Sequence, residues 1–411
     1  MKIGLILSND WELFGDGSGD YFDIQHRPLE EMLCVAEDHG ARLTVMAEVG
    51  QQWAHQQLSA DHAWAGKIAE SWESILKDVV RQGSDVQLHY HPQWSRHKYI
   101  AGRWQLDVDK WALTSLSPDE IRGVFRKGKY YLDQLLKPVR DDYECIAFRA
   151  GAYCIQPSKV VIRELLDAGM ICDTSVTHGF HNPPFYDFRN ANSNCFPWIT
   201  GEDDVCVADE QLQGVLEIPV CSATTIDSAV VRRAMGERHF GRYFLGVNAS
   251  KNDFEWLKDR EKILQLRYPI KNRPSAIRNR VTDSLRGSMV DSVRWAAGKV
   301  MGRRDVQLDY DNLSPSMFVK CIEKAVESVE NSGLKGEDAL IVPVMASGHV
   351  KTMHNCENFR RILSAVEEVF GDRLIYWTLR EAARYWNGRL RSSAVPHLTP
   401  TSTVPDDNPD H

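Results

Sequence analysis

Short apolar runs alternate with amphipathic helical segments along most of this chain, and that alternation limits the fold more than any other feature of the sequence. Strands are expected at residues 2–8, 42–49, 85–91, 145–149, 170–173, 339–345 and 373–378. Helices are expected between them at residues 28–39, 66–82, 118–136, 157–168 and 356–370. Strands that alternate with helices form a parallel sheet or barrel covered by those helices. With 411 residues, 43% of them hydrophobic, the chain can fill the core of one large α/β domain or two ordinary ones.

The alternation breaks between about residues 224 and 315. Within that stretch, residues 232–304 hold 18 Lys and Arg against 7 Asp and Glu, a local net charge of +11 in a chain whose total is −8. This asymmetry predicts an insertion with its own role. The expected organisation is a first α/β part at residues 1–223, a basic and mainly helical insertion at 224–315, completion of the α/β part at 316–391, and a disordered tail at 392–411.

The cysteines and the short apolar runs indicate the cellular compartment in which the protein is expected. The nine cysteines form no CxxC pair, as expected for reduced, buried thiols. The apolar run at the N-terminus is too short for a signal peptide, and no stretch approaches the length of a transmembrane helix. We therefore expect a cytoplasmic protein, peripheral at the inner membrane surface if it meets a membrane. The net negative charge argues against a general affinity for nucleic acid.

Ionisable and polar residues follow nearly every predicted strand. In parallel α/β folds, functional side chains gather at the carboxyl ends of the strands. These ends carry residue types that bind metals and move protons: Asp10, Glu12, His89, His91, Arg149, Asp173, Ser175 and His349.

A metal site can be built from two of these strand ends. His89 and His91 are two residues apart, so both imidazoles can point the same way and clamp a divalent transition metal. Asp10 and Glu12 share a face at the same spacing, so one carboxylate can bind the metal while the other takes a proton from water. Taken alone, the histidine pair is often incidental and the acidic pair could be a solvated loop; together they favour a metal site.

Two further strand ends carry groups that suit the same chemistry. Arg149 can hold a catalytic aspartate in its ionised form, although a structural ion pair is the alternative. His349 follows a strongly apolar strand and can protonate a leaving amine.

Five motifs at the ends of the predicted strands, in their order along the chain, resemble the motifs of the polysaccharide deacetylase family, also called carbohydrate esterase family four. They are Asp10-Trp-Glu12, His89-Tyr-His91-Pro, Phe-Arg149-Ala-Gly, Asp173-Thr-Ser175 and Ser-Gly-His349, and the resemblance covers roughly residues 1–220 and 335–390. It implies an α/β fold, a distorted (β/α) barrel of about seven strands. It also implies that Asp10 is the general base, Glu12, His89 and His91 bind the metal, Arg149 braces the base, Asp173 and Ser175 line the groove, and His349 is the general acid.

This chain departs from the common family pattern at three motifs. Adjacent aspartates are usual in the first motif, whereas this chain has Asn9-Asp10. A strict alignment would make Asp10 the ligand and Asn9 an inactive base, but Glu12 can replace the missing acid. The two histidines are usually three or four residues apart, and the late motif is often Leu-x-His.

The resemblance implies hydrolysis of an N-acetyl group on a sugar, in biosynthesis of a surface glycan such as O-antigen or capsule. Two imidazoles and a carboxylate suit zinc, with cobalt, nickel or iron as alternatives. Trp94, Tyr153 and Trp198 are candidate platforms for sugar rings, with core packing as the alternative reading. Two other functions stay open: a catalytically silent glycan-binding protein, and a glycoside hydrolase that pairs Asp10 or Glu12 with Asp173.

The basic insertion at residues 232–304 is rich in arginine interleaved with aromatic residues. Such a surface can bind the pyrophosphate of a nucleotide- or lipid-linked sugar, or an anionic membrane leaflet. A solvated helical decoration is the simpler alternative.

Overall fold

The expected α/β alternation is confirmed in the computed structural model, which describes residues 1–183, 185–226, 303–331, 340–353 and 356–392. The first half contains β1 (Lys2–Trp11), α1 (Arg27–Asp38), β2 (Leu43–Glu48), α2 (Val49–Leu58), α3 (Ala63–Arg81), β3 (Asp85–Tyr90), α4 (Pro118–Leu136), β6 (Ala147–Ala150), α5 (Lys159–Asp167) and β7 (Cys172–Asp173). The second half contains β10 (Trp198–Ile199), β11 (Leu216–Glu217), β12 (Ser222–Ile226), β13 (Arg303–Gln307), α10 (Pro315–Asn331), β14 (Ile341–Ala346), α11 (Glu357–Phe370), β15 (Leu374–Tyr376) and α12 (Leu379–Arg391). Two small hairpins are β4 (Lys98–Ile100) with β5 (Arg103–Gln105), and β8 (His181–Asn182) with β9 (Tyr186–Asp187).

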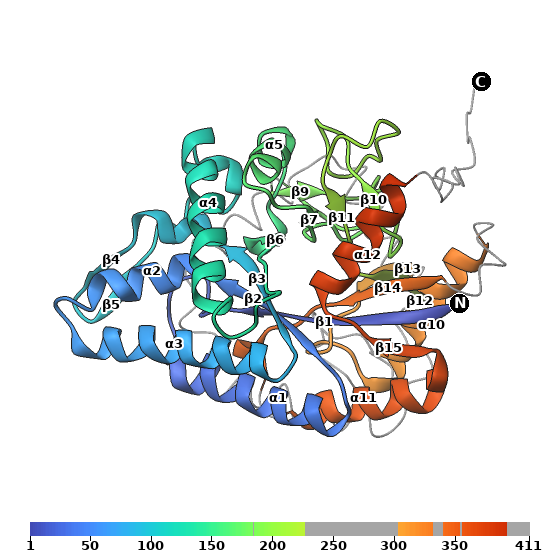
Figure 1. Cartoon of the computed structure of the whole chain (residues 1–411), viewed down its shortest axis with the longest axis horizontal. Coiled ribbons are helices and arrows are strands. Elements are labelled where there is room, and N and C mark those ends of the chain that lie inside the picture. Colours follow the sequence, from blue (N-terminus) through green and yellow to red (C-terminus); the bar gives the residue numbers. More distant parts are fainter. Residues whose placement is uncertain (184, 227–302, 332–339, 354–355, 393–411) are drawn as a thin grey trace.

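A curled, mainly parallel sheet forms the centre of the molecule (Figure 1). Its strand order is β10-β11-β7-β6-β3-β2-β1-β14, with β15 also paired to β1 and only β10 antiparallel to its neighbour among the described strands. Just beyond β11, Val220 forms a parallel bridge with Met345 in β14, which links the two sides of the sheet. Seven parallel strands, β1, β2, β3, β6, β7, β11 and β14, therefore surround one core, and the predicted distorted barrel is confirmed.

Burial of β1 on both faces explains why its sequence is continuously apolar. Nine of its ten residues are buried, as expected for a parallel strand enclosed between helices and barrel interior. Around the barrel, α1 packs on α11, α3 on α4 and α4 on α5. Helix α4 begins at a capping box in which Ser117 and Glu120 satisfy each other's backbone N–H groups.

Helix α12 covers the amino end of the barrel, so the carboxyl end is left for function. The backbone N–H of Leu379 donates to Thr44 near the start of β2, and Arg380 forms an ion pair at 3.3 Å with Asp85, the first residue of β3. Both contacts lie at the amino ends of their strands, opposite the predicted site.

Residues 303–311, which the sequence analysis assigned to the insertion, pack on the barrel. Strand β13 pairs with β12, and Leu308 bonds to Cys221 on one side and Ser347 on the other. Most of the predicted insertion, residues 227–302, lies outside the described residues, as does the predicted tail after Ser392.

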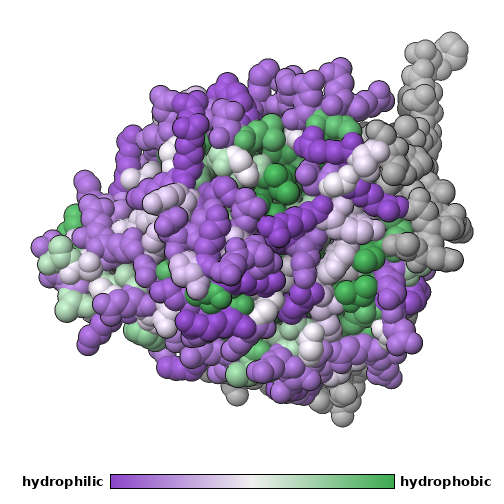
Figure 2. Space-filling view, viewed as in Figure 1, coloured by the Kyte–Doolittle hydropathy of each residue, from purple (hydrophilic) through white to green (hydrophobic). Residues whose placement is uncertain are grey.

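Hydrophilic residues dominate the face of the molecule shown in Figure 2, and hydrophobic side chains gather there only in small patches. Within the described ranges, no helix combines the length and apolarity that a membrane span requires.

Candidate metal centre

The end of β1 directs its two acidic side chains to one side and its asparagine to the other. Asp10 and Glu12 are two residues apart on extended backbone, so they share a face. Asn9 faces the opposite way, where its amide donates to the Tyr310 hydroxyl at 2.9 Å. Tyr310 in turn donates to the Ser8 carbonyl at 2.7 Å. Asn9 thus lies on the other face of β1, and the acids that this segment brings to the site are Asp10 and Glu12.

A buried group of two carboxylates and two imidazoles lies beside Asp10. One potential ligand atom from each of Glu12, Glu48, His89 and His91 lies within 4.8 Å of all the others. Glu12 Oε2 is 2.6 Å from His91 Nε2 and 3.6 Å from His89 Nε2. The predicted ligands Glu12, His89 and His91 are therefore brought together, and their donor set suits a divalent transition metal.

The orientation of His89 favours metal binding through one nitrogen. Its Nδ1 is 2.9 Å from the carbonyl oxygen of Arg149, a contact that requires Nδ1 to carry the proton. In the neutral ring, Nε2 is then the atom with the lone pair, and it is buried without a hydrogen-bond partner among the described residues. Metal-binding histidines commonly donate their other N–H to a backbone carbonyl in this way. The orphaned, inward-facing nitrogen fits a metal ligand.

The charges in this group are strongly coupled. Burial alone would raise the pKa of Glu12, but His91 and Lys351 outweigh it and hold that pKa well below its usual range. Burial opposes protonation of His89, yet the carboxylates of Asp10 and Glu12 raise its pKa to about 9. Protonated His89 thus balances part of the negative charge, and a metal bound there would have to displace that proton.

Glu48 was missed by the sequence analysis. It is the last residue of β2 and the N-cap of α2, where Oε1 accepts the Gly50 N–H at 2.8 Å. Burial is the largest cause that raises its pKa, to about 7. The other site residues were selected because they follow predicted strands. Glu48 ends the buried strand β2, so the same criterion could have identified it.

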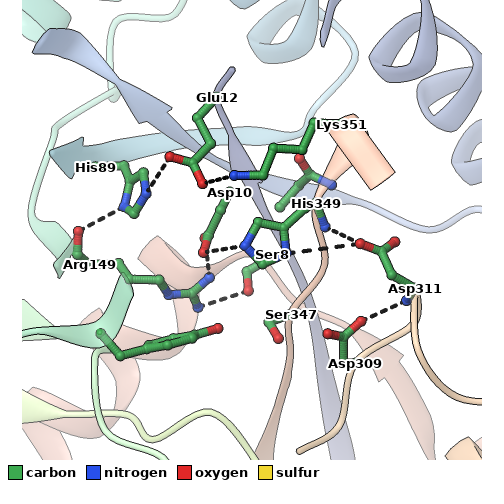
Figure 3. A network of polar contacts seen from close by, with 12 residues as sticks. Ser8, Asp10, Glu12, His89, Arg149, Asp309, Asp311, Ser347, His349 and Lys351 are labelled. Carbon is green, nitrogen blue, oxygen red and sulfur yellow. Dashed lines mark hydrogen bonds and ion pairs between the residues drawn. The ribbon is translucent and has the colours of Figure 1, made fainter. Parts of the chain in front are cut away.

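Asp10 is positioned by Arg149, as predicted (Figure 3). The guanidinium donates to Asp10 Oδ1 at 2.6 Å, and it also donates to Ser8 Oγ and to the Thr174 carbonyl. Burial would raise the pKa of Asp10, but Arg149 and the nearby histidines lower it below its ordinary value. Asp10 is therefore ionised at neutral pH.

His349 lies on the other side of Asp10, with Nε2 3.5 Å from Asp10 Oδ2 (Figure 3). Asp311 accepts the backbone N–H of His349, and its Oδ2 lies 3.9 Å from His349 Nδ1. Burial and then Lys351 lower the pKa of His349, while Asp10, Glu12 and Asp311 oppose that effect. Lys351 also donates to Glu12 Oε1. Asp311 and Lys351 were both missed by the sequence analysis.

The residues predicted to bind substrate lie in different surroundings. Asp173 and Ser175 are fully buried and bonded to each other, and Ser175 accepts the Ala150 N–H, so they support the strand that carries Arg149. This placement corrects the expectation that both line an open groove.

Two of the three predicted sugar platforms are core residues. Trp94 is 4% exposed and packs edge-on against Trp104, and Trp198 is 2% exposed with its indole N–H bonded to Val205. Neither offers a free ring face, because tertiary packing covers both. Tyr153 is half-buried beside Arg149, and its hydroxyl accepts a hydrogen bond from Gln307.

No family model matches this chain, and no curated protein matches it. Solved structures that it resembles include a protein described as a polysaccharide deacetylase from Mycobacterium smegmatis, with 11% identity over 97% of this chain and 93% of the other, at a TM-score of 0.46. A second, described as a polysaccharide deacetylase from Pseudomonas aeruginosa, has 10% identity over 94% and 91%, at 0.41, and an allantoinase has 9% identity over 94% and 90%, at 0.40.

Proposed function

We propose that this chain is a metal-dependent deacetylase that hydrolyses the N-acetyl group of a sugar in a glycan or glycan precursor. One observation carries the proposal: the Asp10 carboxylate lies between Arg149 and His349, on the same side of β1 as Glu12 and the two histidines. A base, an acid and a set of metal ligands thus meet at the carboxyl end of one barrel, which is the arrangement that amide hydrolysis requires.

Glu12, His89 and His91 are the residues that would hold the metal. A bound divalent ion supplies Lewis acidity, which polarises an amide carbonyl and lowers the pKa of water. Zinc suits two imidazoles and a carboxylate, and cobalt, nickel and iron are the alternatives.

Asp10 takes the proton of the attacking water, and the hydroxyl oxygen forms the new bond to the acetyl carbon. Arg149 keeps Asp10 ionised for this step, because burial raises the pKa of the carboxyl and the guanidinium opposes that effect. The C–N bond then breaks, and His349 donates its proton to the departing amine. Its lowered pKa leaves His349 mostly neutral at pH 7, so the proton that it donates is the one that Asp10 took from water and passes to it across the 3.5 Å contact. The products are acetate and a free amino sugar.

The test is acetate release from free, nucleotide-linked, lipid-linked and polymeric N-acetyl sugars, together with metal analysis. We expect activity that a chelator abolishes and a divalent metal restores. Glu12→Gln should lose both metal and activity. Asp16→Asn is the matched control, because it neutralises a carboxylate on the same loop that accepts hydrogen bonds from Ser18.

The other outcomes separate the alternative functions. Glycan cleavage that survives a chelator would favour a glycoside hydrolase, although both Asp173 carboxylate oxygens are already bonded to Ser175. Metal binding without acetate release from any substrate would favour a glycan-binding protein.

A further inference from the structure

We propose that Glu48 is a fourth protein ligand of the metal, so that the centre consists of two histidines and two carboxylates. The inference rests on the proposed function, because it assumes the metal that Glu12, His89 and His91 would hold. It changes the expected charge and the number of open positions of that centre.

The register of the sheet places Glu48 beside the other ligands. Glu48 is paired with His89, and His89 is paired with Arg149 on the next strand. Register partners in a parallel sheet project to the same face. On the other side of β2, Trp11 is paired with Ala47, so Glu12 follows at the level of Glu48. Glu12, Glu48 and His89 therefore lie at one level across three neighbouring strands.

The two oxygens of Glu48 have different surroundings. Oε1 accepts the Gly50 N–H at 2.8 Å and so caps helix α2. Oε2 is buried and has no hydrogen-bond partner within the described part of the chain. An unpaired buried carboxylate oxygen is costly, and native structures usually provide it with a partner. A metal ion shared with His89 and His91 would satisfy it.

Distances and charge are both compatible with one ion. Two ligand atoms bound to the same ion at about 2.2 Å can be at most about 4.4 Å apart. The observed limit of 4.8 Å among the four groups requires a contraction of only a few tenths of an ångström. Two carboxylates also balance the charge of a divalent cation, which favours its transfer into a site where all four residues are buried.

A fourth protein ligand reduces the number of coordination positions of the ion that are open to water or substrate. With four protein ligands, a water or a substrate oxygen can bind only if the ion accepts a fifth ligand. Zinc sites expand to five ligands during catalysis, and iron or cobalt sites do so readily. We therefore expect the loaded centre to be at least five-coordinate when an acetamide binds.

The alternative is that Glu48 only caps α2, and Glu48→Gln distinguishes the two roles. Glutamine keeps a carbonyl oxygen for the Gly50 N–H and replaces the anionic oxygen by an amide NH₂. The matched control is Asp133→Asn. Asp133 is also a largely buried carboxylate, but it accepts the N–H of Cys145, which precedes β6 at the opposite end of the barrel.

The experiment is a Zn²⁺ titration of the chelator-treated full-length protein. We expect Glu48→Gln to bind Zn²⁺ at least about tenfold more weakly, since even partners that only orient a ligand are worth 10–100-fold in affinity. Asp133→Asn should bind within twofold of the wild type, and Glu12→Gln should lose binding. Metal-free Glu48→Gln should melt at or above the wild-type temperature, because a buried charge beside Glu12 is removed.

The outcomes separate the two proposals. Unchanged affinity in Glu48→Gln with loss in Glu12→Gln would overturn the fourth ligand and leave the proposed function intact. Unchanged affinity in both would overturn the metal centre itself. The crystal structure of the Zn²⁺-loaded wild type decides the question even if a variant fails to fold: Glu48 Oε2 at about 2.0–2.2 Å from the ion supports the inference, and a separation above about 3 Å refutes it.

Discussion

Replacing Arg149 by methionine tests how the site keeps its base ionised. Arg149 is fully buried, and it donates to Asp10 at 2.6 Å, to Ser8 at 2.8 Å and to the Thr174 carbonyl at 3.0 Å. Arg149→Met leaves Asp10 as a buried carboxylate without its cation. Removing one partner of a buried ion pair costs about 3–5 kcal/mol of folding stability, because the remaining charge is desolvated and unpaired. We expect a loss of that size in metal-free protein at pH 7.

A double-mutant cycle shows whether the charge is the cause. Asp10→Asn should destabilise the wild type, because the guanidinium loses its anionic partner. The same change should stabilise Arg149→Met by at least about 1 kcal/mol, because a neutral amide is less costly to bury than a carboxylate. Urea denaturation in the presence of a chelator measures all four proteins. If Asp10→Asn destabilises both backgrounds equally, the two side chains are not coupled and the reasoning fails.

The pH dependence of the same variant has a defined sign. The pKa of Asp10 is lowered in the folded wild type, so its ionised form contributes stability above the unfolded pKa of about 3.9, and that contribution is lost as pH falls through the folded pKa. The difference between wild type and Arg149→Met should therefore be largest at neutral pH and shrink in acid. In the variant, the pKa of Asp10 should rise because the guanidinium that lowers it is gone, which moves the acid limb of the rate profile to higher pH.

Three further changes test the remaining contacts. Asp10→Asn should retain metal and lose about 10²–10⁴-fold in turnover, which metal analysis and acetate release measure on the same sample. The Asp311 carboxylate favours the protonated form of His349, so Asp311→Asn should lower the pKa of His349. The alkaline limb of the rate profile should then move to lower pH, and an unmoved limb would show that Asp311 does not influence His349. Gly151→Ala would place a Cβ 2.5 Å from the His91 ring, so Zn²⁺ affinity should fall by about tenfold or more, and unchanged affinity would show that the ring can shift at no cost.

Local sequence patterns predicted most strands and helices because burial dictates composition over short distances. The apolar runs at 2–8 and 85–91 became β1 and β3 with small changes at the ends, and the helix expected at 118–136 matches α4. The end of the insertion was harder to place, since strand β13 is defined by its pairing with β12 far away in the sequence. The sequence analysis missed Asp311 for the same reason, because Asp311 follows β13 in the chain.

Aromatic residues show why surface and core could not be separated from the sequence. Trp94 follows the His89-Tyr-His91 motif directly, so its position along the chain suggests the mouth of the site. In the fold it lies over Gly50, whose added Cβ would come within 2.9 Å of it, and against Trp104 of the β4–β5 hairpin. These contacts join segments from three parts of the chain, and no local pattern predicts them.

The choice between Asp10 and Glu12 as the ligand depends on sheet register, which a sequence does not contain. Both carboxylates face the same way at a spacing of two, so either could reach a metal. Asp10 is paired with Met46, two residues before Glu48, and the level of His89 is reached at Glu48. Glu12 is therefore at the level of the imidazole, whereas Asp10 is two residues deeper, and the Arg149 side chain reaches down to it from the level of His89. Asp10, the proposed base, is consequently paired with a cation inside the barrel, and Glu12, the proposed ligand, lies beside the two imidazoles.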